Sequence, residues 1–211
     1  MNACTYHKNN LQNKFQKTCK FNSEFTQIKF RREVANLKKA NRINIGPFLS
    51  KVSIRLDEGI LIMDNLKPEY DTLTEWSSKA QKQNLNFQLN CKSLQNLLSI
   101  IKDMLNSQFL HMDLNFDNIM INHSQKVQIV DFAEVHTFHT NPFSDLQQRY
   151  KPIPFLKKEE DLSLEELLEE AFISFMGDMS ECSKLFDDEA FEYLKSVFSS
   201  GKSILSELIK K

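Results

Sequence analysis

Apolar side chains recur every three or four positions in several stretches of the chain, a pattern typical of amphipathic helices. One stretch runs from Phe25 to about Ala40, and Ser23 stands where a helix cap is expected. The clearest stretch is Cys91–Ser107, whose apolar stripe consists of Leu94, Leu97, Leu98, Ile101, Met104 and Leu105. Further helices are predicted over residues 161–176, 183–199 and 202–210, and a short one from Asp71 or Thr72 to Trp76.

Short apolar runs between turn residues predict β-strands. The predicted strands are Ala3–His7, Phe15–Phe21, Phe48–Ile54, Gly59–Met63, Ile119–Ile121 and Val127–Val130. Polar or proline-containing segments at residues 66–70, 84–90 and 137–154 have loop character. Short strands interspersed with helices predict an α+β fold.

Charge and cysteine usage narrow the classes of function. The formal net charge is −1, so the chain lacks the basic footprint of a nucleic-acid-binding protein. No stretch approaches the roughly 18 apolar residues of a membrane span, and the first residues do not resemble a signal peptide. The four cysteines are Cys4, Cys19, Cys91 and Cys182, and no two form a CxxC pair. We therefore expect reduced thiols and a cytoplasmic protein.

The most informative polar residues lie between positions 111 and 132. Asp113, Asn118 and Asp131 follow the long predicted helix and flank a tight pair of predicted strands. A carboxylate such as Asp113 can orient a hydroxyl and accept its proton. Asn118 and Asp131 offer hard oxygen ligands, which suit magnesium bound together with substrate phosphates. Taken singly, Asp and Asn in loops are usually surface turn residues, so the joint pattern carries the hypothesis.

That joint pattern has a known parallel. His111-x-Asp113-Leu-x-x-x-Asn118, followed thirteen residues later by Asp131-Phe132, resembles the catalytic loop and metal-binding motif of protein kinases. The resemblance implies that Asp113 is the catalytic base and that Asn118 and Asp131 hold Mg²⁺. It also implies that His111 and Phe132 pack beneath the site and couple the two motifs.

Upstream residues extend the resemblance. Protein kinases pair a strand lysine with a helix glutamate to hold the α- and β-phosphates of ATP. Lys17, in a segment similar to that strand, and Glu33, sixteen residues later in the predicted helix, are the candidates. Lys20 is the competing lysine, and both Lys17 and Glu33 are also compatible with solvent-exposed positions. Leu37 would lie one turn beyond Glu33, facing the core.

The segment Gly59–Leu66 resembles the strand that enters the hinge between kinase lobes. The resemblance implies that Met63 lies at the back of the adenine pocket. The backbone of Asp64 and Leu66 would then bond the edge of the adenine ring. Met63 as an ordinary core residue is equally compatible with the sequence.

The implied architecture is a bilobal protein-kinase-like fold. Residues 1–66 would form a truncated N-lobe, a small antiparallel sheet plus a helix at 24–41, together with the hinge. Residues 67–211 would form a compact, mainly helical C-lobe with the catalytic loop at 111–118 and the metal motif at 131–133.

Several positions depart from the family pattern. No glycine precedes Gly46, so the glycine-rich phosphate loop is missing. Ala133 replaces the usual glycine after Asp-Phe, and Asn115 replaces the usual lysine. No Ala-Pro-Glu motif follows Asp131. The short chain resembles minimal kinases such as bacterial effector kinases, viral kinases and the small kinase of the tRNA-modifying complex, which would place an effector or viral protein in the host cytoplasm.

Three functions follow from this resemblance. The leading interpretation is an ATP- and Mg²⁺-dependent protein Ser/Thr kinase with a protein substrate. The second is a pseudokinase acting as a binding module, favoured by the missing glycine loop and Ala133. The third is a small-molecule kinase of the aminoglycoside or choline type, although those enzymes usually carry a larger helical lobe.

Overall fold

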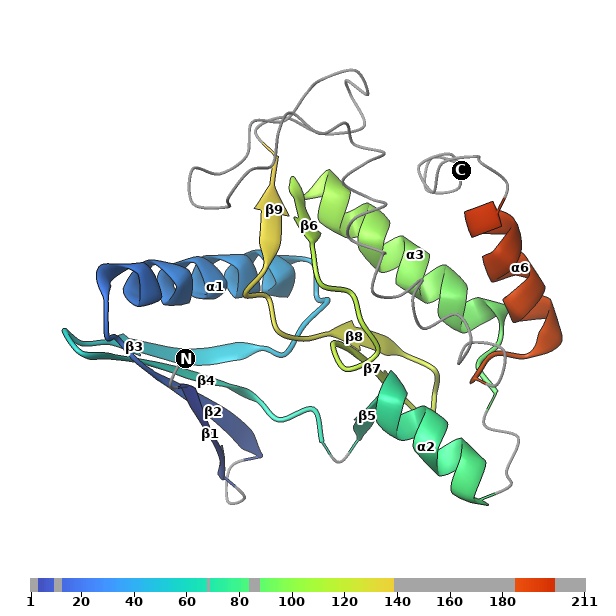
Figure 1. The fold of residues 1–211 in the computed structure, drawn as a ribbon, viewed down its shortest axis with the longest axis horizontal. Helices are drawn as coiled ribbons and strands as arrows, with labels where there is room; N and C mark the ends of the chain where they lie inside the picture. The colour runs from blue at the N-terminus through green and yellow to red at the C-terminus, as the bar shows by residue number, and fades with distance from the viewer. Residues whose placement is uncertain (1–3, 10–12, 68, 84–87, 139–184, 200–211) are drawn as a thin grey trace.

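The computed structural model describes residues 4–9, 13–67, 69–83, 88–138 and 185–199 (Figure 1). Its strands are β1 (Cys4–Asn9), β2 (Lys14–Lys20), β3 (Leu49–Ile54), β4 (Glu58–Asp64), β5 (Tyr70–Thr72), β6 (Phe109–His111), β7 (Ile119–Asn122), β8 (Val127–Ile129) and β9 (Val135–Thr137). Its helices are α1 (Glu24–Arg42), α2 (Leu73–Gln83), α3 (Cys91–Asn106) and α6 (Asp188–Ser199). The architecture is mixed α+β with antiparallel sheets, as predicted.

The first four strands form one antiparallel sheet in the order β1-β2-β4-β3. Their bounds agree with the sequence prediction to within two residues. Strand β4 lies between β2 and β3, so Leu61 is paired with Lys17 on one side and Val52 on the other. The register fixes which side chains of β2 and β4 share a face, because successive residues of a strand point to opposite faces.

Helix α1 lies along this sheet (Figure 1). Ser23 caps its first turn by accepting a hydrogen bond from the Thr26 amide, as the sequence suggested, and Thr26 returns the bond in a capping box. A small apolar cluster joins helix and sheet, consisting of Cys19, Phe30, Val34 and Leu61. The ring of Phe30 packs so closely on Gly59 that a side chain there would clash with it. This contact sets the distance between α1 and β4.

Helix α3 packs against β6, β8 and α6, and its predicted span of Cys91–Ser107 is confirmed to within one residue. Strands β7 and β8 are also confirmed, and β5 adds to them to make a three-stranded sheet. The sequence pattern did not predict β5, β6 or β9. The helix expected to end at Trp76 instead begins at Leu73 and continues to Gln83, and Tyr70, assigned to a connector, lies in β5. Each of these strands has three residues, too short for an alternating pattern to be visible.

Part of the predicted C-terminal region lies outside the described residues. This applies to the loop at 139–154 and the helices predicted over 161–176 and 202–210. Within the described part, α6 (Asp188–Ser199) covers all but the first five residues of the helix predicted at 183–199 and packs against α3.

The expectation of reduced thiols is wrong for two of the cysteines. Cys4 and Cys19 form a disulfide between β1 and β2. They are direct partners in the antiparallel register, which brings together two residues that are 15 positions apart in the sequence. The expected cytoplasmic location rested partly on reduced thiols, so this pair removes that support.

Reduction of this disulfide should destabilise the sheet that carries Lys17. A cross-link that closes a loop of this length lowers the conformational entropy of the unfolded chain. In the chain-entropy model this raises the free energy of unfolding by about 3 kcal/mol. We expect urea unfolding of the unmodified protein to shift to lower urea when a thiol reductant is added. The Cys4→Ser variant should unfold at the reduced position with or without reductant. Equal unfolding of both proteins under non-reducing conditions would contradict the prediction.

Candidate functional site

A buried ion pair links the sheet to helix α1. Lys17 Nζ lies 2.7 Å from Glu33 Oε1, and the two side chains are only 9% and 10% exposed. Burial raises the pKa of the Glu33 carboxyl, while the charge and hydrogen bond of Lys17 act to lower it. Lys20, the competing candidate, is exposed on the same strand. The structure therefore brings Lys17, and not Lys20, to Glu33.

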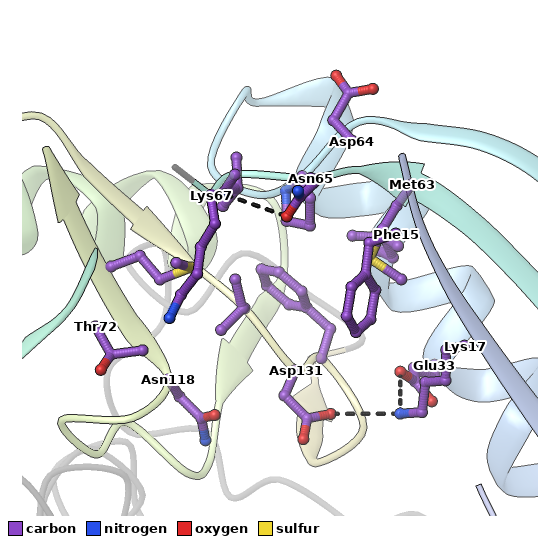
Figure 2. A pocket seen from close by; sticks show the side chains of 16 residues that line it. Phe15, Lys17, Glu33, Met63, Asp64, Asn65, Lys67, Thr72, Asn118 and Asp131 are labelled. Atoms are coloured by element: carbon purple, nitrogen blue, oxygen red, sulfur yellow. Dashed lines mark hydrogen bonds and ion pairs between the residues drawn. The ribbon is translucent and has the colours of Figure 1, made fainter. Parts of the chain in front are cut away.

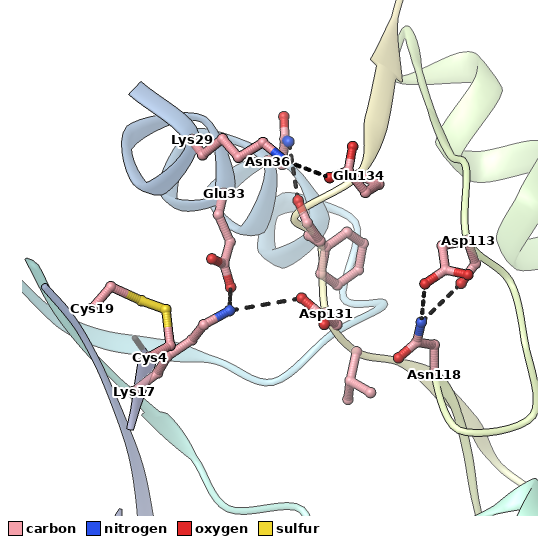
Figure 3. A network of polar contacts seen from close by, with 12 residues as sticks. Cys4, Lys17, Cys19, Lys29, Glu33, Asn36, Asp113, Asn118, Asp131 and Glu134 are labelled. Atoms are coloured by element: carbon pink, nitrogen blue, oxygen red, sulfur yellow. Dashed lines mark hydrogen bonds and ion pairs between the residues drawn. A yellow bond between two sulfur atoms is a disulfide. The ribbon is translucent and has the colours of Figure 1, made fainter. Parts of the chain in front are cut away.

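Asp131 approaches the same lysine from the other side of the site (Figure 3). Its Oδ1 lies 3.8 Å from Lys17 Nζ, and its side chain is 48% exposed. The backbone of Asp131 is in the left-handed region, with φ of 58°. Non-glycine residues seldom adopt this conformation, and where they do it is often at functional sites. The conformation aims a solvent-accessible carboxylate at the space beside the ion pair.

The loop between β6 and β7 fixes the second carboxylate. Asp113 Oδ1 accepts a hydrogen bond from Asn115 Nδ2 at 2.8 Å, and Oδ2 accepts one from Asn118 Nδ2 at 2.9 Å. Asn115 Oδ1 in turn accepts bonds from the backbone amides of Asp117 and Asn118, both at 3.0 Å. Such a network restricts the rotamer of Asp113, because both oxygens are already oriented by donors.

His111 connects this loop to the Asp131 segment from beneath. Its Nε2 lies 3.1 Å from the Val130 carbonyl and 2.9 Å from the Asp131 carbonyl, while Nδ1 accepts the Asp113 amide at 3.1 Å. The His111 ring is fully buried and packs edge-on against the Phe132 ring, with 5.3 Å between the two ring centroids. Burial lowers the pKa of His111, so the neutral ring, with Nε2 protonated, fits these contacts.

Lys17, Glu33, Asn118 and Asp131 line a cavity of about 380 Å³ (Figure 2). It is lined by Phe15, Lys17, Glu33, Leu37, Pro47, Met63, Asp64, Asn65, Leu66, Lys67, Thr72, Asn118, Met120, Val130, Asp131 and Phe132. Much of the wall is apolar. Lys17, Glu33 and Asp131 meet at one end of the cavity, and Asp64 and Lys67 lie away from them (Figure 2). A volume of this size with a few convergent polar groups is typical of a small-molecule or cofactor site.

The end of β4 and the residues that follow it supply one wall of the cavity. Met63 and Asp64, the last two residues of β4, and Leu66 all line it. The Asp64 amide donates to the Phe48 carbonyl at 2.9 Å, and the Leu66 carbonyl accepts the Tyr70 amide at 3.0 Å. These bonds hold the connector against the sheet on one side and β5 on the other.

Comparison with known proteins addresses the fold. No family model matches the chain, and no curated protein matches it. Among solved structures, monomeric WbdD has a TM-score of 0.55 at 14% identity, with 94% of this chain and 43% of that chain covered. The chain has a protein-kinase-like fold.

Other solved kinases match a smaller part of the chain. A structure of WbdD described as a bifunctional kinase-methyltransferase has a TM-score of 0.45 at 17% identity, covering 59% of this chain and 28% of that one. The Cydia pomonella granulovirus kinase PK-1 has a TM-score of 0.47 at 17% identity, covering 60% and 46%. The chain spans less than half the length of each of these structures.

The kinase-like fold brings the predicted site residues to one place. The cavity is lined by Lys17, Glu33, Asn118 and Asp131, together with Met63, Asp64 and Leu66. Asp113 is not part of the cavity wall, but it is hydrogen-bonded to Asn118, which is. Their individual roles in catalysis remain predictions.

The donor set at the cavity fits a magnesium ion bound with phosphates. The Asn118 Nδ2 group is occupied by Asp113, which leaves the amide oxygen as the available ligand atom. The Asp131 carboxylate, which also lines the cavity, would be the second oxygen ligand. Within the described ranges, no three His, Cys, Asp or Glu side chains cluster in a way that could hold a metal ion. Mg²⁺ usually takes one or two protein carboxylates and completes its shell with phosphates and water, so a protein-only cage is not required.

Several residues at or beside the cavity were not singled out in the sequence, among them Phe15, Lys67 and Asn36. Phe15 lies two positions before Lys17 on β2, so strand alternation alone places both side chains on one face. Lys67 lines the cavity and forms an ion pair with Glu75. Asn36 donates to the Phe132 carbonyl, a contact between residues 96 positions apart that no local pattern could reveal.

None of the helices in the described parts of the chain combines the length and apolar character needed to cross a bilayer.

The ion pair should make Lys17 far more important for stability than its neighbour Lys20. Removing one partner of a buried pair leaves an uncompensated charge, which typically costs about 3–5 kcal/mol. We expect Lys17→Met to lower the free energy of unfolding by about that amount in urea titrations at pH 7. Lys20→Met, on the exposed side of the same strand, should change it by less than about 0.5 kcal/mol.

The double variant Lys17→Met/Glu33→Leu should recover much of the stability lost in Lys17→Met, because no lone charge then remains buried. Similar unfolding midpoints for Lys17→Met and Lys20→Met would show that the pair does not stabilise the fold.

Proposed function

We propose that the chain is an ATP- and Mg²⁺-dependent phosphotransferase that acts on Ser or Thr hydroxyl groups of proteins. The observation that carries this proposal is the convergence of Lys17, Glu33, Asp131 and Asn118 on one cavity, with Asp113 bonded to Asn118. The fold shared with WbdD supports the phosphotransferase class. In this proposal residues 1–66 act as the N-lobe and hinge, and residues 67–211 as the C-lobe.

The cavity suggests how the nucleotide would lie. The adenine ring would occupy the apolar end against Met63, with its edge toward the backbone of Asp64 and Leu66. The phosphates would extend toward Lys17, whose ammonium group is held in place by Glu33. Mg²⁺, held by Asn118 and Asp131, would neutralise charge on the phosphates. Positioning and charge neutralisation are the main demands of phosphoryl transfer.

Asp113 would act on the acceptor. Its carboxylate orients the substrate hydroxyl and takes the proton as the hydroxyl oxygen bonds to the γ-phosphorus. The bond from that phosphorus to the β,γ-bridging oxygen breaks, and ADP leaves. The network from Asn115 and Asn118 holds the carboxylate ready for this step.

A pseudokinase is the second candidate, because Ala133 replaces the glycine expected after Asp-Phe and no glycine-rich loop is present in the sequence. A small-molecule kinase is the third. The cytoplasmic location, or the host cytoplasm for an effector or viral protein, also stays a prediction.

Replacing the base should abolish transfer without abolishing binding. In assays with γ-phosphate-labelled ATP, Mg²⁺ and casein or histone as acceptor, we expect Asp113→Asn to lower kcat by about 10²- to 10⁴-fold, since that is the usual contribution of a general base. Asp117→Asn, an exposed acid in the same loop, is the matched control and should retain activity.

The assay also separates the competing functions. Mg²⁺-dependent ATP binding without transfer to any acceptor would identify a pseudokinase. Transfer to aminoglycosides or choline, but not to proteins, would identify a small-molecule kinase. Transfer that Asp113→Asn leaves unchanged would reject Asp113 as the base.

Phe15 should contribute to binding of the adenine ring of ATP and not to binding of its phosphates. Its side chain points into the cavity beside Met63 (Figure 2). A base stacked on an aromatic ring typically loses about 1–3 kcal/mol on alanine substitution. We expect calorimetry to show ATP binding at least about fivefold weaker in Phe15→Ala, with binding of inorganic tripolyphosphate unchanged.

Phe15→Leu is the matched variant, because it keeps apolar bulk and removes the flat face. It should bind ATP with intermediate affinity. Tighter ATP binding by Phe15→Ala would instead mean that the ring fills the space where the base was expected.

A further inference from the structure

Helix α1 contacts the Asp131–Glu134 segment through residues on one of its faces. Lys29 Nζ lies 3.3 Å from Glu134 Oε1, Glu33 is linked through Lys17 to Asp131, and Asn36 Nδ2 donates to the Phe132 carbonyl at 3.1 Å. Positions 29, 33 and 36 are separated by four and three residues, so they line up on the same side of the helix. Figure 3 shows Lys29 and Asn36 directed at the segment and Glu33 directed at Lys17.

The Asn36 contact is buried and uncharged, whereas the other two are made by charged groups and one of them, between Lys29 and Glu134, is exposed. Asn36 is 6% exposed, whereas the side chains of Lys29 and Glu134 are both more than 40% exposed. Exposed ion pairs contribute little, because solvent screens them. A buried amide or carbonyl that loses its partner incurs a desolvation cost. The bond between Asn36 and Phe132 is therefore the contact of this face that most strictly fixes the backbone of the segment.

Two consecutive carbonyl groups of the segment are thus held from opposite sides. His111 Nε2 bonds the Asp131 carbonyl at 2.9 Å from the loop, and Asn36 bonds the Phe132 carbonyl from the helix. Asp131 has a left-handed backbone with φ of 58° although it is not glycine. Such a conformation persists only where the surroundings hold it. Because the carboxylate direction follows from this backbone, a group that holds Phe132 also directs Asp131.

We propose that Asn36 is a positioning residue for metal-dependent phosphoryl transfer, acting through Phe132 to keep the Asp131 carboxylate aimed at the cavity. This inference rests on the proposed function. The helix then does more than supply Glu33, because the same face orients the lysine at one turn and the metal ligand at the next. A displacement of α1 would disturb both together.

The test compares two asparagines of the same helix. Asn41 makes equivalent side-chain bonds elsewhere, donating to the Pro47 carbonyl and accepting the Leu49 amide, both at 2.8 Å. Asn36→Leu and Asn41→Leu should both lower thermal stability. We expect only Asn36→Leu to raise the Mg²⁺ concentration for half-maximal rate, by up to about tenfold for one lost hydrogen bond, and to lower kcat, with KM for ATP little changed. Equal Mg²⁺ requirements in the two variants would overturn the inference while leaving the proposed function intact.

Amide hydrogen exchange gives a second readout that does not need catalysis. In the full-length protein without nucleotide, Asn36→Leu should speed exchange across residues 130–135 relative to both the unmodified protein and Asn41→Leu. If the unmodified protein proves inactive but this difference is found, the proposed phosphotransferase function is wrong, and the inference that Asn36 fixes the backbone of the segment is supported. If exchange there is the same in both variants, Asn36 has only a general structural role.

Discussion

The buried pairing of Lys17 with Glu33 is the interaction on which the arrangement of the site depends. The Lys17 side chain is 9% exposed, and burying a charge without a partner is costly, so Glu33 at 2.7 Å provides the compensating charge. The pair fixes α1 against β2. Lys17 on β2 reaches Asp131, whereas Asn36 and Lys29 on α1 reach Phe132 and Glu134. The position of one helix relative to one strand therefore affects where the Asp131 carboxylate, the proposed metal ligand, points.

Much of this site could be predicted because several of its residues lie at short, fixed separations along the chain. Asp113 and Asn118 share one loop, and the hairpin of β7 and β8 returns the chain directly to Asp131. The spacing of these residues in the sequence therefore indicates that they lie close together in the fold. Lys17 and Glu33 could be predicted because a strand and the following helix pack side by side. The α+β class followed from periodicity in the longer elements.

Other features depend on contacts between distant segments or on very short elements. Strands β6 and β9 have three residues each and pair across 24 to 28 positions of sequence, so their propensities are too weak to reveal them. The Cys4–Cys19 disulfide follows from the register of β1 and β2, which no cysteine spacing encodes. Asn36 stands between Ala35 and Leu37 in the sequence, and only its burial and its bond to Phe132 in the structure distinguish it.

The two carboxylates beside Lys17 differ in a way that suits their proposed tasks. Glu33 is nearly buried, and burial raises its pKa, so it depends on the lysine to stay ionised. Asp131 lies farther from the lysine, at 3.8 Å, and is 48% exposed, so solvent already stabilises its charge. Withdrawing Glu33 from Lys17 would leave two desolvated charges, whereas turning Asp131 toward a metal would leave none. The same lysine thus has a permanent partner in the helix and an exchangeable one in the loop, which is the condition for a site that binds metal and nucleotide without losing its fold.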